Sequence, residues 1–237
     1  MREMKLIRLS RLKVVVLIVV FLISATANSE NSEELSVKTI LEKVAEKYSE
    51  MESYQDWGIV ETEVKRVTFE TYFIRPNMFR FRWKSDFIAK GKIFYSTYNM
   101  IWSNDKGAYT LHDYDKPDSE IEKEENIRMA IAGATGISSG AAYKIAGLLM
   151  DEPDDWLVSN PNVPEVIGID KICDYNCYHI KDIHPRTNTE YHLWIDTHSF
   201  LVHRVKEIFP DFVDETNYCH IVVNEDINLD VFDVHRK

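Results

Sequence analysis

The feature that most constrains the fold is a strict alternation at residues 79–84, which read Phe-Arg-Phe-Arg-Trp-Lys. Successive side chains of a β-strand point to opposite faces, so this segment predicts a strand with one aromatic face and one cationic face. An aromatic face of this kind needs a cover, while the cationic face stays in contact with water. The chain is therefore expected to build a sheet with one buried side.

Further strand-like runs lie on both sides of this segment, and short turn sequences separate them. Arg75-Pro76-Asn77 is a turn, and residues 104–107, Asn-Asp-Lys-Gly, form a hairpin connection. A parallel return needs a dozen or more residues, so these short turns predict an antiparallel sheet. A sheet this long must curl or split. The expected strands are 59–68, 69–74, 79–84, 92–98, 99–103, 108–112, 166–171, 178–183, 190–196, 201–209, 216–224 and a short piece at 231–234.

Three helices are predicted to cover the sheet. The first carries one apolar stripe, with Ser36 as its N-cap, formed by Val37, Ile40, Leu41, Val44, Ala45, Tyr48 and Met51. Two shorter apolar patterns at 127–134 and 141–149 flank the sequence Gly-Ile-Ser-Ser-Gly at 136–140. The expected fold class is α+β: a curled antiparallel half-barrel sheet, covered by an N-terminal helix and two short lid helices.

The first 27 residues resemble a secretory signal peptide. Basic residues precede an unbroken apolar run at 14–23, and Ala25-Thr26-Ala27 supplies small residues for cleavage. The alternative is an uncleaved membrane anchor. The apolar run at 14–23 is shorter than the roughly 20 apolar residues that a membrane-spanning helix needs. We expect a signal peptide at 1–27, a single domain at 28–237, no stable membrane span after cleavage, and a periplasmic or otherwise extracytoplasmic location.

The formal net charge of −11 excludes nucleic acid as a main partner, because a phosphate backbone requires clustered Lys and Arg. Cys173 and Cys177 flank a turn-like Asp-Tyr-Asn sequence, and in an oxidising compartment they are candidates for a short disulfide. A metal or redox role for this pair stays open. Cys219 lies in a strand-like run and is expected to be a small buried side chain.

The inner face of the predicted sheet, together with the short helices, is rich in aromatic and aliphatic residues. Two interpretations stay open: these side chains pack as core, or they line an apolar cavity that the helices do not fill. The candidate cavity residues are Phe73, Phe79, Phe81, Trp83, Tyr95, Ile131, Leu148, Tyr191, Leu193 and Ile195.

The chain resembles the LolA-like group, the outer-membrane lipoprotein-sorting protein superfamily. The resemblance spans nearly all of residues 28–237. It rests on the helix end at 48–54, the strand–turn–strand at 69–81, Thr-Gly-Ile-Ser at 135–138, Leu-Trp-Ile-Asp at 193–196 and a tail at 224–232 that closes the sheet. It implies an open half-barrel with helices over an apolar concave face, which binds lipid or lipoprotein acyl chains. Outer-membrane lipoprotein sorting is one such role, and no cofactor is implied. The loop at 151–164 and the cysteine pair depart from the best-known carriers.

Two other classes of function were weighed against a lipid carrier. One is an envelope sensor or interaction module on the same fold, with a packed interior and another envelope protein as its partner. The other is a secreted serine esterase, because residues 136–140 match the G-x-S-x-G pattern around Ser138. That pattern requires a preceding strand, whereas a helix is predicted there, so no catalytic residue and no enzymatic activity are expected. The histidines do not follow metal-ligand spacings, so no metal site is expected.

Overall fold

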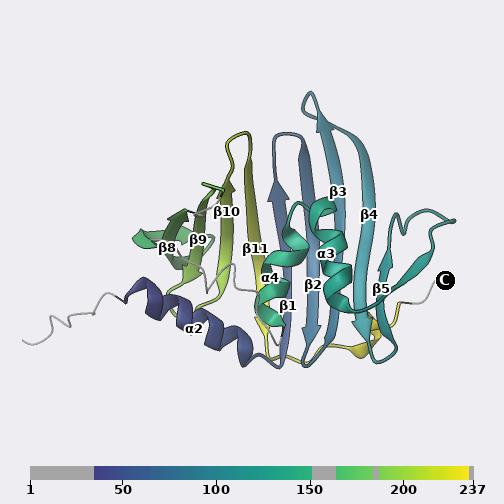
Figure 1. Ribbon diagram of the computed structural model, residues 1–237, viewed down its shortest axis with the longest axis horizontal. Coiled ribbons are helices and arrows are strands. Elements are labelled where there is room, and N and C mark those ends of the chain that lie inside the picture. Colours follow the sequence, from purple (N-terminus) through teal and green to yellow (C-terminus); the bar gives the residue numbers. More distant parts are fainter. Residues whose placement is uncertain (1–34, 151–163, 184–186, 235–237) are drawn as a thin grey trace, which may run out of the picture. The chain divides into compact units, whose positions relative to one another are not determined.

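One sheet of eleven antiparallel strands forms the frame of the molecule, which is a computed structural model that describes residues 35–150, 164–183 and 187–234 (Figure 1). The strand order is β6-β5-β4-β3-β2-β1-β11-β10-β9-β8-β7. The strands are β1 (Ser53–Glu61), β2 (Lys65–Ile74), β3 (Met78–Ala89), β4 (Lys92–Asn104), β5 (Gly107–Leu111), β6 (Ile121–Glu124), β7 (Glu165–Ile172), β8 (Tyr175–Ile183), β9 (Glu190–Asp196), β10 (Val202–Ile208) and β11 (Val213–Val223).

The sheet consists of two meanders that join where β1 pairs with β11. β1 to β6 lie in chain order on one side of this junction, and β11 back to β7 lie on the other. The two outer strands β6 and β7 are not paired with each other, so the sheet stays open. The antiparallel, turn-connected arrangement predicted from the sequence is confirmed. Residues Ser36–Lys237 form one compact unit.

The three predicted helices are confirmed and lie over one face of the sheet: α2 (Val37–Ser49), α3 (Ile127–Ile137) and α4 (Ala141–Leu149) (Figure 1). Ser36 caps α2, since its side chain accepts a hydrogen bond of 3.1 Å from the Thr39 backbone N–H. The stripe of α2 is buried at Ile40, Leu41, Val44 and Tyr48. α4 packs against both α2 and α3, so the helices form one layer.

The alternation at residues 79–84 produces the two faces expected. Phe79, Phe81 and Trp83 are fully buried, and the Phe81 ring lies 5.4 Å from that of Trp83 and 5.3 Å from that of Phe69. On the other face, Arg82 forms an ion pair of 2.8 Å with Glu70. Large rings packed in this way bury much apolar area and dominate the stability of a core.

Arg75, in the turn between β2 and β3, joins the sheet to two helices. Its guanidinium donates to the carbonyls of Met51 (2.9 Å) and Tyr48 (3.1 Å) at the end of α2, and to that of Leu149 (3.4 Å) at the end of α4. Carbonyls at helix C-termini lack partners within the helix and favour a cation. One side chain therefore fixes the C-terminal ends of both helices next to the turn between β2 and β3.

The C-terminal segment corrects one sequence expectation. Instead of a strand at 231–234 that closes the sheet, it forms the 3₁₀ helix η1 (Leu229–Phe232), which packs on β3 and β4. Arg80 donates to the Val231 carbonyl at 2.9 Å from the cationic face of β3, and the Phe232 side chain is buried. Asn228 starts the helix by accepting from the Asp230 N–H at 3.0 Å, because a short polar side chain competes with strand pairing.

The expected signal peptide at 1–27 lies outside the described residues, as does the expected loop at 151–164 except for its last residue. Within the described ranges, no helix combines the length and the apolar composition that crossing a bilayer requires.

Phe81→Ala is expected to lower the free energy of unfolding by about 3–5 kcal/mol, because it leaves a cavity among packed rings. The matched control is Phe94→Ala, since Phe94 is 78% exposed, whereas Phe81 is 1% exposed. The control should stay within about 0.5 kcal/mol of the parent protein. Urea denaturation measures both; a Phe81→Ala variant as stable as the parent would show that the aromatic face is not the core.

Candidate functional site

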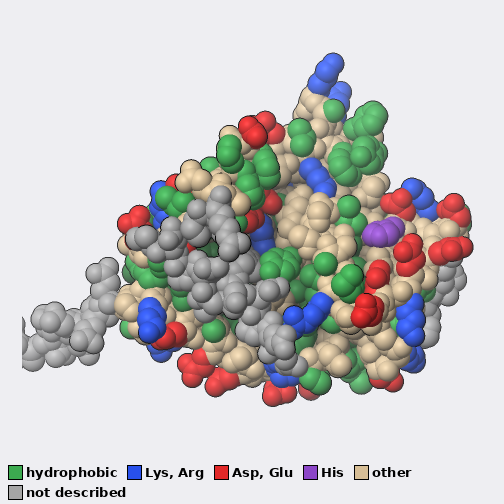
Figure 2. All heavy atoms as spheres, in the orientation of Figure 1, with side chains coloured by type: hydrophobic (Ala, Val, Ile, Leu, Met, Phe, Trp, Pro, Cys, Tyr) green, Lys and Arg blue, Asp and Glu red, His purple; other side chains and the backbone are tan. Residues whose placement is uncertain are grey.

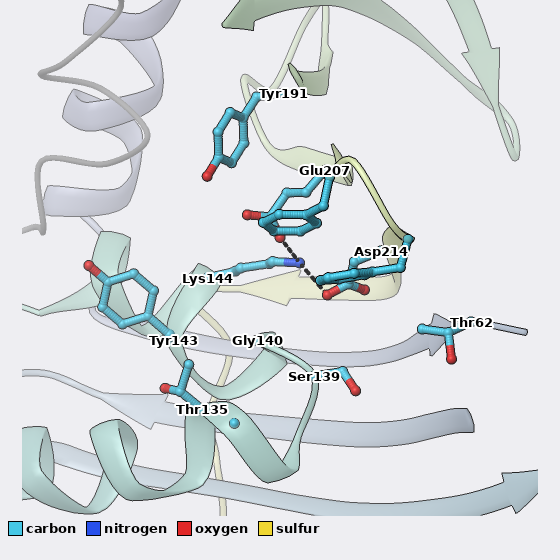
Figure 3. Close-up of a pocket in the computed structure, with 12 residues that line it drawn as sticks. Thr62, Thr135, Ser139, Gly140, Tyr143, Lys144, Tyr191, Glu207 and Asp214 are labelled. Atoms are coloured by element: carbon cyan, nitrogen blue, oxygen red, sulfur yellow. Dashed lines mark ion pairs between the residues drawn. The ribbon is translucent and has the colours of Figure 1, made fainter. Parts of the chain in front are cut away.

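A pocket of about 480 Å³ opens on the helix-covered face, between the α3–α4 connection and strands β9 to β11 (Figure 3). This volume lies within the range typical of small-molecule sites. Its walls combine the aromatic residues Tyr143, Phe209 and Phe212 with small residues, and its floor is charged. The lining residues are Thr62, Thr135, Gly136, Ser139, Gly140, Tyr143, Lys144, Tyr191, Glu207, Phe209, Phe212 and Asp214.

The floor of the pocket is a row of polar side chains across three neighbouring strands. Glu207 on β10 lies directly opposite Tyr191 on β9 and directly opposite Asp214 on β11. Directly opposed residues of antiparallel strands point to the same face, and like charges in this position repel each other. Two carboxylates on a covered face therefore require a cation.

Lys144 on α4 supplies that cation. Its Nζ lies 2.7 Å from Glu207 Oε2, 3.5 Å from Asp214 Oδ2 and 3.0 Å from Thr216 Oγ1 (Figure 3). The residue is only 3% exposed. A buried charge is tolerated when it is paired and hydrogen-bonded. The three N–H groups of the ammonium are matched by these three oxygens, which ties α4 to β10 and β11.

Asp214 is the least satisfied member of the cluster. Its Oδ2 faces Lys144, whereas its Oδ1 has no hydrogen-bond partner among the residues that the structure describes. Burial raises the pKa of Asp214 above its ordinary value, the Lys144 charge opposes this shift, and the Glu207 charge adds to it. Burial, with the charge of Glu207, also raises the pKa of Tyr191 to about 12. This shift moves the phenol further from ionisation at physiological pH, where an ordinary tyrosine is already neutral.

Gly140 leaves room for the ammonium. Its φ of +76° favours glycine, and a Cβ at this position would lie 3.2 Å from Lys144 Cε and 3.8 Å from Asp214 Oδ2. The residue precedes the first turn of α4, so the backbone approaches the ion cluster closely where a larger residue would crowd it.

Ser138 has a structural role in the same connection. Its side chain is fully buried, accepts from the Ala142 N–H at 3.2 Å and donates to the Thr135 carbonyl at 3.3 Å. The segment before it is helix α3, as predicted, and not the strand that a nucleophile elbow requires.

A second, smaller cavity of about 130 Å³ lies between α3 and α4. Apart from Arg128 it is apolar, and Tyr143 lines both this cavity and the main pocket. The other lining residues are Ile131, Ala132, Ala146, Gly147 and Met150. The Tyr143 side chain therefore lies at the boundary between two spaces.

The structure places the ten candidate cavity residues in different environments. Tyr191 lines the main pocket and Ile131 lines the smaller cavity. Tyr95 is half exposed near the end of the β3–β4 hairpin, stacked at 4.2 Å on Phe87. The others are buried between sheet and helices: Phe73, Phe79, Phe81, Trp83, Leu148, Leu193 and Ile195.

The charged floor was missed by the sequence interpretation, although one signal pointed to it. Residues 141–149 read Ala-Ala-Tyr-Lys-Ile-Ala-Gly-Leu-Leu, a helix that is apolar on every side except for Lys144. A helix of this composition is expected to be buried on all sides, and a buried lysine requires an anionic partner. The partners themselves depend on strand register, which the sequence pattern did not define.

All three cysteines carry free thiols in the structure: Cys173 is exposed, Cys177 is buried and Cys219 is partly buried. Burial raises the pKa of the Cys177 thiol to about 12, and this thiol donates to the Tyr175 carbonyl. The disulfide between Cys173 and Cys177 stays a prediction. His179 and His192 meet across β8 and β9 at 2.8 Å. Among the described residues, no three His, Cys, Asp or Glu side chains gather as a metal site.

Lys144→Ala is expected to destabilise the protein by about 3–5 kcal/mol at neutral pH, because it leaves two buried carboxylates without their cation. A carboxyl group whose folded pKa lies above its unfolded value destabilises the fold at high pH, and this cost disappears as the pH falls. The loss should therefore shrink toward about pH 5, as urea denaturation at both pH values would measure. The control is Lys38→Ala, whose side chain is exposed on α2; a loss that does not depend on pH would contradict the ion-cluster account.

No family model and no curated protein matches the chain, whereas solved structures do. LprF from Mycobacterium bovis aligns at a TM-score of 0.49 and 13% identity, over 81% of this chain and 94% of that chain. Lipoprotein LppX of Mycobacterium tuberculosis aligns at 0.48 and 10% identity, over 81% and 99% of the two chains.

The complex of MucA with MucB from Pseudomonas aeruginosa aligns at a TM-score of 0.50 and 10% identity. The alignment covers 84% of this chain and 60% of that one. At such identities the likeness concerns the fold alone. The chain has the open, curled antiparallel sheet with helices on one face that the LolA-like resemblance implied, and the LolA-like fold is confirmed at the level of architecture.

Proposed function

We propose that this protein is an extracytoplasmic binder of an amphiphilic lipid or lipoprotein, whose acyl chain enters the pocket beneath α4. The observation that carries this proposal is the pocket of about 480 Å³, which has three aromatic residues in its walls and one charged end. Tyr143, Phe209 and Phe212 supply apolar area, and the Phe209 and Phe212 rings stack at 4.3 Å in the β10–β11 turn. A ligand with an apolar tail and a polar head matches a pocket that has an apolar part and a charged end.

The energetics need no chemistry beyond burial. Each methylene taken out of water contributes about 0.8 kcal/mol, so ten buried methylenes contribute about 8 kcal/mol before the costs of association. Micromolar binding corresponds to a net free energy of about 8 kcal/mol, so the acyl chain has to bury more than ten methylenes to offset the costs of association. The buried, backbone-bonded hydroxyl of Ser138 supports a binding role rather than ester hydrolysis. The signal-peptide-like sequence at 1–27 supports an extracytoplasmic site of action, and lipoprotein sorting is the finer role within this proposal.

A second candidate function is an envelope-protein interaction module. It is supported by the aromatic face of β3, where Phe79, Phe81 and Trp83 are buried as core. In this case the pocket beneath α4 would receive a side chain of a partner protein. Native mass spectrometry of gently purified protein separates the two: a bound mass that extracts as lipid supports the carrier, and a clean apo mass supports the module.

Phe212→Asp is expected to weaken binding of a fluorescent acyl probe at least about tenfold, because a charge replaces apolar wall at the pocket mouth. Phe212 is 55% exposed, so the fold should persist. The matched control is Ile169→Asp, an exposed residue on β7 away from the pocket. Fluorescence titration measures the affinity; equal affinity for both variants would remove the pocket from the proposal.

Tyr143→Ala is expected to join the main pocket to the smaller cavity, because Tyr143 lines both. The variant should shift its preference toward longer acyl chains, as a titration series of fatty alcohols of increasing length would measure. An unchanged chain-length preference would show that the two cavities do not serve one ligand.

A further inference from the structure

The polar end of the pocket offers an unpaired acceptor rather than a free cation. Asp214 is 6% exposed and lines the pocket, yet its Oδ1 has no hydrogen-bond partner among the described residues (Figure 3). A buried acceptor without a donor costs about 1–3 kcal/mol. A ligand group that donates a hydrogen bond to this oxygen would recover that free energy.

The ammonium beside it is already engaged. Lys144 Nζ has three N–H groups, and three oxygens of Glu207, Asp214 and Thr216 lie around it at 2.7, 3.5 and 3.0 Å. A bound anion would have to displace one of these carboxylates from the cation. The second lysine near Asp214 is Lys65, whose Nζ donates to the Ile137 carbonyl at 2.6 Å.

The charges that face the pocket also disfavour an anion. Of the described side chains that line the pocket, Lys144 is cationic and Glu207 and Asp214 are carboxylates, while Tyr191 is a neutral phenol at neutral pH. In a low-dielectric pocket, an unpaired negative charge beside these carboxylates is strongly disfavoured. Acidic and basic side chains are interspersed on the face shown in Figure 2, and the formal net charge of the chain is −11.

We propose that the pocket selects amphiphiles whose head group donates hydrogen bonds and carries no negative charge, that is a hydroxyl or an ammonium, and that it rejects carboxylate and phosphate heads. This inference rests on the proposed acyl-binding function and names the class of ligand. The head group would sit at Asp214 Oδ1, with its tail along Tyr143, Phe209 and Phe212.

The test compares three ligands that share one chain length: palmitoylglycerol, hexadecylammonium and palmitate. Each displaces a fluorescent acyl probe from the full-length mature protein near neutral pH. The hydroxyl and ammonium heads are expected to bind at least about tenfold more tightly than the carboxylate, which corresponds to one satisfied acceptor. Palmitate that binds as tightly as palmitoylglycerol overturns the head-group selection while leaving acyl binding intact. Failure of all three to bind overturns the proposed function as well.

Asp214→Asn tests the residue. It should reduce the advantage of hexadecylammonium over palmitate by about tenfold, because the negative charge is lost and an NH2 group replaces one of the two carboxylate oxygens. Asp211→Asn is the matched control, since Asp211 is exposed in the β10–β11 turn and loses the same charge. Equal effects of the two substitutions would assign the selection to overall charge and contradict a role of Asp214. Circular dichroism confirms the fold of each variant, and the rank order in the parent protein tests the proposal independently of any variant.

Discussion

The ammonium of Lys144, buried between Glu207 and Asp214, is the contact on which the ligand-binding side of the molecule depends. The two carboxylates lie directly opposite each other on β10 and β11, where like charges repel. The cation that relieves this repulsion comes from α4. The same ion pairs therefore neutralise the two carboxylates and hold the helix against the sheet. Arg75 holds the opposite end of α4 through the Leu149 carbonyl. With both ends fixed, α4 forms the roof of a pocket without filling it.

The two halves of the covered face differ because their side chains differ in size. Strands β2 and β3 carry large buried rings, while α3, which packs over β4 and β5, buries the small residues Ala130 and Ala134. Beneath α4, the strands β9 to β11 present carboxylates and a threonine, which leave volume near Gly136 and Gly140. Packing density is uniform in protein interiors, so volume that side chains do not occupy is available to a ligand. The pocket is thus a consequence of which residues face inward on each strand.

Much of this architecture follows from local sequence patterns. Alternation at 79–84 predicts the aromatic face, the short turns predict antiparallel pairing, and the apolar stripe at 37–51 predicts α2. The pocket cannot be predicted from these patterns. Alternation along a strand indicates which face of the sheet a residue occupies, but it does not indicate what covers that face. Phe81 and Tyr191 both point to the covered face, yet one is core and the other lines the pocket. Thr216 is 72 residues from Lys144 in the chain, and only strand register brings the two together.

A binding site built from apolar area alone would accept any acyl chain, because each methylene contributes the same free energy whatever head group it carries. Selectivity among amphiphiles therefore has to come from the polar end of the pocket. Replacing a buried ion pair with apolar residues of similar volume often leaves stability unchanged or improves it, so stability alone does not explain why a chain retains one. Among the described residues, Asp214 Oδ1 has no hydrogen-bond partner, whereas the Lys144 ammonium is surrounded by three oxygens; this arrangement is poor for the stability of the empty protein and discriminating for a ligand. This asymmetry connects the charge pattern of α4, β10 and β11 to recognition of a head group.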